Sequence, residues 1–360
     1  MKKRIFVYLL VVSLILLMPI IQNRHQQIDN SSDIKAHTAV IQAVVDGQPL
    51  PYIIYMGVLV IAYPLAGIVK LTGFDVRTVY IWFNFIALIG AAFSLFFVTR
   101  KLVNKTASWL SVPITMFCSV SILAMFTAGV IFNVINMYVI LPWAVYFMVK
   151  WITQKKWYYW LISIAMLGLF FVFHASGMYL PFAMASFLGG AILWRILKGQ
   201  YTSFKPILML CLPLMAIGVG LSARLLPLLG YLDRLGMDYG AINPSQFVKL
   251  NLGFVTAILL CLGIYGYIVS RKLIRISIEA KLFGLLLLCF VLPLAVGMAF
   301  NILSASARLA LDLGAIMALI IACLLGVLLD TKRGWWIKDA VTYLTIAGVC
   351  ITLFSWLRAG

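Results

Sequence analysis

The sequence predicts an all-α polytopic membrane protein with about 11 transmembrane helices, and three observations support this prediction. Of the 360 residues, 64% are hydrophobic and 11% are charged, an apolar share far above that of soluble domains. Apolar runs of about 20 residues, the length that crosses the hydrocarbon core of a bilayer, recur along the chain. The Lys and Arg residues fall mainly in the short connections between these runs.

The predicted spans form one integral membrane domain, residues 1–360. The chain begins with basic residues and a long apolar stretch, as a signal peptide does. No small-x-small cleavage site follows, so we interpret this stretch as the first span. The predicted spans cover residues 5–22, 79–99, 107–126, 130–149, 157–173, 178–194, 206–223, 253–270, 282–300, 309–329 and 339–357.

The basic residues predict the orientation of the bundle. With the N-terminus in the cytoplasm, the cytoplasmic connections contain 19 of the 28 Lys and Arg residues, as the positive-inside rule expects. Most of the 10 acidic residues fall on the other side of the membrane or at its boundary. We therefore expect any chemistry that uses carboxylates on the extracytoplasmic face of the plasma (inner) membrane.

Residues 52–72 are apolar enough to span, but the charge distribution argues against it. If they crossed the membrane, the next span would place Arg100, Lys101 and Lys105 outside. Pro64 and its neighbouring glycines favour an interfacial or re-entrant segment instead. The first outer loop, residues 22–77, is then long and carries two juxtamembrane helices.

The first outer loop contains three polar residues at helical spacing. Asp29, Asp33 and His37 lie at i, i+4 and i+8, so on a helix they share one face. Asp33 is the candidate general base that takes the proton from an attacking hydroxyl, and His37 would orient Asp33 or contact a phosphate. The alternative is a solvated polar face on a surface loop.

Arginines near the outer boundary are candidate phosphate ligands. Arg308 and Asp312 lie one turn apart at the outer end of a late span, where charges usually pair or line a cavity. Arg308 would hold a lipid phosphate with its forked donors and Asp312 would set its rotamer; the alternative is a structural ion pair. Arg224 and Arg234, in the second outer loop (residues 223–252), would bind phosphate or extend to lipid head groups.

Several classes of function are excluded by the sequence. The net charge of +18 does not indicate nucleic-acid binding, because the basic residues lie in connections between spans. The six cysteines fall inside apolar runs and the three histidines lack ligand spacing, so neither a disulfide framework nor a zinc site is predicted. No phosphate-binding loop, dinucleotide fingerprint or G-x-S-x-G motif is present.

The first 105 residues resemble the membrane glycosyltransferases of the GT-C superfamily. The resemblance lies in Asp33-x-x-x-His37, an apolar helix ending in glycine, the Thr-Gly-Phe-Asp sequence at residues 72–75, and a span that closes in Thr-Arg-Lys-Leu. Many members carry a second acid in the next outer loop, where residues 126–137 of this chain offer only Asn133 and Asn136.

The resemblance implies a reaction and a set of partners. GT-C enzymes take a sugar from a polyprenyl-phosphate-linked donor on the outer face, and the acid in the first loop is the catalytic or metal-contacting carboxylate, which here is Asp33. Arg308, Asp312, Asp29, Arg224 and Arg234 are then the candidate donor-binding residues. The acceptor would be a lipid, a glycan or a protein, and the candidate cofactor is a divalent cation, Mg²⁺ or Mn²⁺.

Two other hypotheses stay open. An O-antigen or exopolysaccharide polymerase also pairs many spans with outer-loop arginines, but it usually places its large outer loop late in the chain. A transporter places polar residues within its spans and often shows related halves. This chain has few ionisable residues within its predicted spans and no visible repeat.

Overall fold

The structure, a computed structural model, describes most of the predicted spans and part of the first outer loop. The described residues are 8–9, 11–13, 15–17, 32–49, 56–118, 131–173, 183–189, 212, 216, 253–270, 274, 276–299, 306–331 and 335–359.

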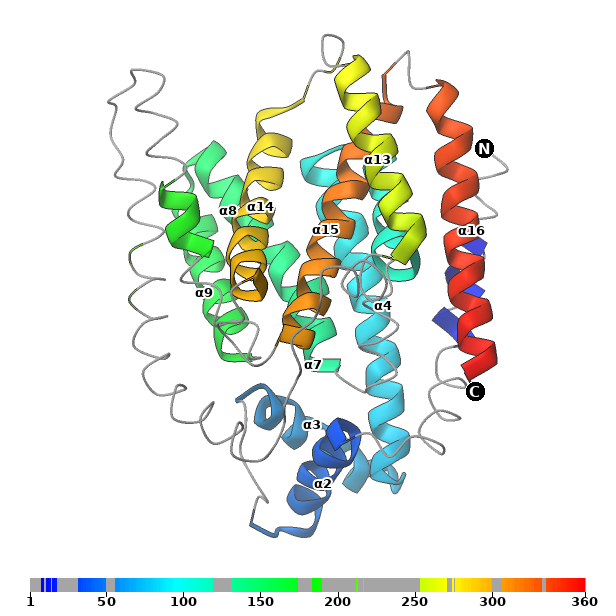
Figure 1. The fold of residues 1–360 in the computed structure, drawn as a ribbon. Helices are drawn as coiled ribbons and strands as arrows, with labels where there is room; N and C mark the ends of the chain where they lie inside the picture. The colour runs from blue at the N-terminus through cyan, green and yellow to red at the C-terminus, as the bar shows by residue number, and fades with distance from the viewer. Residues whose placement is uncertain are drawn as a thin grey trace.

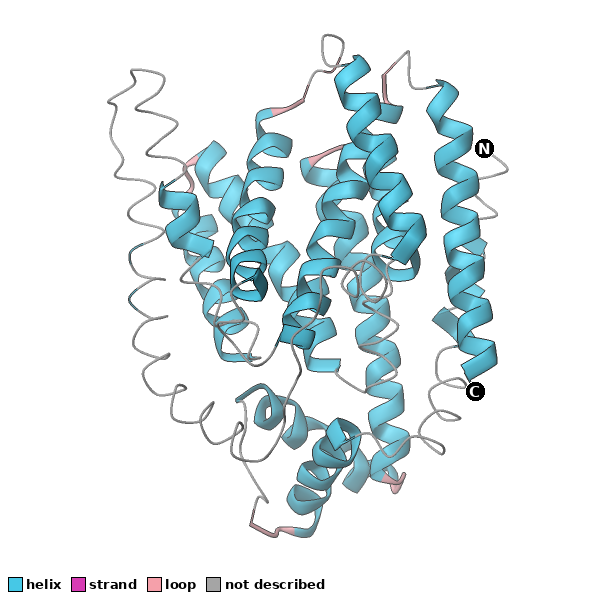
Figure 2. Cartoon of the chain, viewed as in Figure 1, coloured by secondary structure: helices cyan, strands magenta, loops and turns pink. Residues whose placement is uncertain are grey.

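The described residues form helices and no strands (Figure 2). Two of the helical segments, η1 and η2, are π-helical. The elements are α2 (Ser32–Asp46), α3 (Met56–Thr72), α4 (Val76–Leu102), α5 (Lys105–Val112), η1 (Pro113–Cys118), α7 (Ile131–Val134), η2 (Ile135–Ile140), α8 (Leu141–Gln154), α9 (Trp157–Phe173), α13 (Gly253–Ser270), α14 (Ile278–Ala299), α15 (Ser306–Leu329) and α16 (Trp335–Ala359).

The all-α prediction is confirmed for the described residues, whereas the predicted number of spans is not. Three of the described helices are both long and apolar enough to cross a membrane, over residues 76–102, 132–154 and 312–329. The bounds of α4, α9, α13, α15 and α16 agree with predicted spans to within four residues at each end. The apolar runs therefore located these elements correctly, and the total of about 11 spans stays a prediction.

Most helices run alongside one another in a bundle, and α2 and α3 lie together at one end of it (Figure 1). We call this end the site end. The opposite end, which we call the basic end, carries the connections α4–α5, α8–α9 and α15–α16. At the basic end Lys150 Nζ lies 2.7 Å from Glu279 Oε1, and Asn104 Nδ2 donates to the Gly326 carbonyl at 3.2 Å.

Local sequence explains why α2 and α3 end where they do. The α2 helix ends at Gly47, which has φ +66, and the Gln48 N–H donates to the Ala43 carbonyl at 2.9 Å. This is a Schellman motif, in which glycine takes the left-handed conformation without a Cβ penalty. The α3 helix ends at Gly73, which has φ +71 and donates its N–H to the Val69 carbonyl at 2.9 Å, the simpler αL motif. Gly47 and Gly73 therefore mark the C-terminal ends of two separate helices.

Asp75 starts α4 directly after this break. Its carboxylate accepts hydrogen bonds from the Thr78 N–H at 2.9 Å and the Thr78 hydroxyl at 2.6 Å. These bonds favour the ionised form and hold the pKa of Asp75 below its ordinary value. Asp75 is therefore the N-cap of α4, which begins at the site end and extends to the basic end (Figure 1).

Candidate functional site

The candidate site lies where α2 meets the bundle. Val40 and Ile41 on α2 are buried, while Gln42 and Asp46 on its opposite side are exposed and hydrogen-bonded to each other. The apolar face of α2 packs against α3 and α4. This amphipathic pattern holds α2 against the end of the bundle and directs His37 toward the neighbouring helices.

His37 is held on two sides by residues of other helices. Its Nδ1 lies 2.8 Å from the hydroxyl oxygen of Tyr80, a fully buried residue of α4. Its ring meets the Phe132 ring of α7 in an edge-to-face arrangement, with ring centroids 4.5 Å apart. A hydrogen bond and an aromatic contact from two different helices fix the orientation of the imidazole.

The residue after Phe132 extends the site to α15. Asn133 is buried, and its Nδ2 donates to Asp312 Oδ1 at 2.7 Å. Asp312 is only 1% exposed. Burying a carboxylate is costly unless it accepts hydrogen bonds, so this contact is a requirement of the fold at this position. The α7 helix thus connects the His37 contact to the Asp312 contact.

The structure places the two other central candidates by their backbones. Asp33 lies one turn before His37 on α2, and Arg308 lies one turn before Asp312 on α15. The side chains of Asp33 and Arg308 lie outside the described residues, as do Asp29, Arg224 and Arg234 entirely. Their predicted roles, including the contact between Asp312 and Arg308, therefore stay predictions.

Three residues of this site were not predicted from the sequence. In the sequence, Tyr80 and Phe132 look like ordinary apolar residues of spans, and nothing in their local sequence indicates that they belong to a site. Asn133 carried a weak signal, because it occupies the outer stretch in which GT-C members often have a second acid. Its contact with Asp312 joins positions 179 residues apart in the chain, so only the tertiary structure reveals it.

The described side chains do not form a complete metal site. Among the described residues, no three His, Cys, Asp or Glu side chains lie together as ligands would. The site offers the Asp312 carboxylate, the Asn133 amide and the His37 imidazole from its described part. A divalent cation would need further oxygen ligands, and Asp33 is the candidate that the first outer loop supplies.

Comparison with known proteins agrees with the helical architecture. The family model of dolichyl-phosphate-mannose-protein mannosyltransferases matches residues 57–218, a region that begins in α3 and leaves out α2. The crystal structure of the apo oligosaccharyltransferase from Archaeoglobus fulgidus superposes with a TM-score of 0.51 at 13% identity. The family match and the superposition both agree with the resemblance of the first 105 residues to the GT-C superfamily.

A second solved structure gives the same result. AglB, the oligosaccharyltransferase of Archaeoglobus fulgidus in complex with an inhibitory peptide and a dolichol-phosphate, superposes with a TM-score of 0.51 at 12% identity. Both superpositions cover 97% of this chain and 54% of the archaeal chain, so the chain spans about half the length of these relatives. At such low identity the likeness concerns the fold. A search of the curated proteins finds no match.

Proposed function

We propose that this protein is a glycosyltransferase of the GT-C type that moves a sugar from a polyprenyl-phosphate-linked donor to an acceptor on the extracytoplasmic side of the membrane. The family match to dolichyl-phosphate-mannose-protein mannosyltransferases supports a lipid-linked donor. The dolichol-phosphate in the AglB complex supports the same class of donor.

One observation carries the proposal. The α2 helix, which bears Asp33 and His37, is docked on the end of the bundle beside the buried Asn133–Asp312 pair. An acid on a helix that is rigidly attached to the bundle can stay within hydrogen-bond reach of a reacting hydroxyl. A solvated surface loop, the alternative interpretation of this segment, would not need a histidine held by Tyr80 and Phe132.

The proposed reaction assigns one task to each residue. The acceptor oxygen attacks the anomeric carbon of the sugar as the bond from that carbon to the phosphate oxygen breaks. The Asp33 carboxylate takes the proton of the acceptor, and the electron pair of the broken bond leaves with the lipid phosphate. Arg308 stabilises the leaving phosphate, while His37 positions the α2 helix and with it Asp33.

Charge supports the assignment of the reaction to the extracytoplasmic side. The described helix ends at the basic end include Lys101, Lys105 and Lys156, and α2 lies at the site end (Figure 1). If the basic end faces the cytoplasm, the positive-inside rule puts α2 and the proposed reaction outside.

The test compares two carboxylates of α2 in the purified protein. With polyprenyl-phosphate-linked sugars as donors, Asp33→Asn should lower the rate of transfer by about 10² to 10⁴, because it keeps the shape and removes the base. Asp46→Asn is the matched control, since Asp46 is exposed and bonded only locally to Gln42 among the described residues. Near-normal transfer by Asp33→Asn would assign the base to another residue.

A further inference from the structure

We infer that Asn84 of α4 and Tyr138 of η2 form a binding site for hydroxyl groups of the donor's sugar. The inference rests on the proposed function and extends it from the reacting groups to sugar recognition. It starts from two polar side chains that are buried inside the bundle and have no hydrogen-bond partner among the described residues.

Asn84 lies one turn further into the bundle than Tyr80, the residue that holds His37. It is 1% exposed, and neither its Oδ1 nor its Nδ2 has a hydrogen-bond partner within the described part of the chain. Burying an amide without partners is costly, so such groups usually bind a ligand or water. Since Tyr80 and Asn84 are both buried and four residues apart, they lie on one face of α4.

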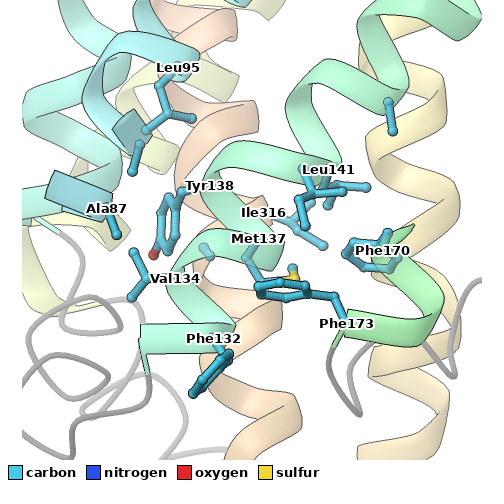
Figure 3. Close-up of a cluster of buried hydrophobic side chains, with 14 of the residues drawn as sticks. Ala87, Leu95, Phe132, Val134, Met137, Tyr138, Leu141, Phe170, Phe173 and Ile316 are labelled. Atoms are coloured by element: carbon cyan, nitrogen blue, oxygen red, sulfur yellow. The ribbon is translucent and has the colours of Figure 1, made fainter. Parts of the chain in front are cut away.

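Tyr138 approaches the same face of α4 from η2. It is 1% exposed, and its hydroxyl also lacks a partner among the described residues. Figure 3 shows this hydroxyl pointing between Ala87 and Val134 rather than into the aromatic cluster. Ala87 follows Asn84 by three residues on the buried face of α4, so the phenol and the amide approach the same part of the bundle.

The position of Tyr138 connects it to the candidate site. The η2 segment follows α7 directly, so Tyr138 lies five residues after Asn133, whose amide donates to Asp312. Tyr138 also belongs to a π-helical segment, and π-helical turns often occur at functional sites because the extra residue redirects side chains. Asn84 thus follows Tyr80 on α4, and Tyr138 follows Asn133 on the continuous α7–η2 segment, by about one helical turn each.

The chemistry of the two groups indicates the kind of ligand. An amide offers donors and an acceptor side by side, and a phenol offers one of each. Neither group is charged, so the pair suits neutral hydroxyls rather than a phosphate. A sugar attached to a phosphate presents such hydroxyls, and Ala87 and Val134 beside the phenol supply apolar surface for its carbon–hydrogen faces.

The test uses substitutions that remove the polar groups and keep the volume. Tyr138→Phe and Asn84→Leu should lower kcat/KM for polyprenyl-phosphate mannose or glucose by about tenfold or more, the loss expected for a missing hydrogen bond to a ligand. Thermal stability without donor should be unchanged or higher, because a buried unpaired polar group has been removed. Ser163→Ala is the control, since Ser163 is a buried unpartnered residue in the described part of α9.

A binding measurement separates sugar recognition from phosphate recognition. Wild-type protein should gain more thermal stability from polyprenyl-phosphate mannose than from bare polyprenyl phosphate, and this difference should shrink in Tyr138→Phe while the response to bare phosphate stays. If both Tyr138→Phe and Asn84→Leu lose stability while their kinetics with the donor stay as in the wild type, the inference is overturned. The two polar groups would then bind buried water rather than sugar. A wild-type protein that neither transfers nor binds any sugar donor would contradict the proposed function itself.

Discussion

At the scale of single residues, His37 shows how a polar side chain can be positioned by apolar surroundings. Its ring lies between the Tyr80 hydroxyl and the Phe132 ring, and both come from helices of the bundle. Because Tyr80 is fully buried, the hydrogen bond is shielded from water and strongly directional. We therefore assign His37 a positioning role for α2.

Tyr80→Phe tests this role without changing the volume of the side chain. Loss of one hydroxyl should reduce transfer by about tenfold, the value of one hydrogen bond of ~1.4 kcal/mol. His37→Ala should have a similar effect, and the double variant should be no worse than the single variants because both remove the same contact. Rate measurements on the double-mutant cycle decide this, and strictly additive losses would contradict a shared contact.

Arg308 is the residue whose charge and shape matter together in the proposed reaction. Arg308→Lys keeps the charge but loses the bidentate fork, so it should raise KM for the lipid-linked donor more than KM for the acceptor. Kinetics with varied donor concentration provide the measurement. An effect of Arg308→Lys on acceptor dependence alone would mean that Arg308 does not hold the donor phosphate.

At the scale of elements, the bundle depends on a close approach of α5 and α15. A Cβ added at Gly326 of α15 would lie 2.3 Å from the Cα of Ala107, which is backbone and cannot rotate away. Beside this contact, Asn104 caps α5 by accepting from the Ala107 N–H at 2.6 Å and donates to the Gly326 carbonyl. A small residue at position 326 is thus a condition for the packing of two helices.

Gly326→Ala should therefore destabilise the protein by about 1–3 kcal/mol, the usual cost of forcing atoms into a packed interior. Gly284→Ala on α14 is the matched control, because nothing lies within 4 Å of a Cβ built there. Thermal unfolding in detergent measures both variants. Equal stability of the two would show that α5 and α15 can separate without loss.

At the scale of the whole molecule, the two ends of the bundle differ in charge and in the structural elements that they carry. The basic end carries Lys101, Lys105 and Lys156, whereas the site end carries α2, α3 and the Asp75 cap (Figure 1). The positive-inside rule connects this asymmetry to the direction of insertion. The α3 helix lies at the site end with α2, the position expected for an interfacial segment.

Cysteine labelling in intact cells tests this orientation. In a background without the six native cysteines, Lys101→Cys and Lys156→Cys should react only after the membrane is permeabilised, while Gln48→Cys should react from outside. All three positions are exposed, and Asn104 is unsuitable because it caps α5. Reaction of Lys156→Cys from outside would invert the orientation and remove the proposed roles of Asp33 and His37.

The sequence by itself predicted the helical class and the bounds of many helices. This was possible because a bilayer requires long apolar runs whose backbone groups are all paired within the helix, and those runs are visible residue by residue. It also indicated the α2 helix, since the acid, the histidine and the closing glycine at position 47 are local signals. The family match over residues 57–218 and the two superpositions agree with the GT-C resemblance of the first 105 residues.

Only the tertiary structure decided what surrounds these residues. Asp312 accepts a hydrogen bond from Asn133, 179 positions earlier, and His37 is hydrogen-bonded to Tyr80, on a helix that the sequence presents as an ordinary span. Likewise Asn84 and Tyr138 look like isolated polar residues in apolar runs until α4 and η2 lie side by side. In a membrane bundle, hydropathy determines where helices form, whereas the packing of specific faces determines which polar groups meet.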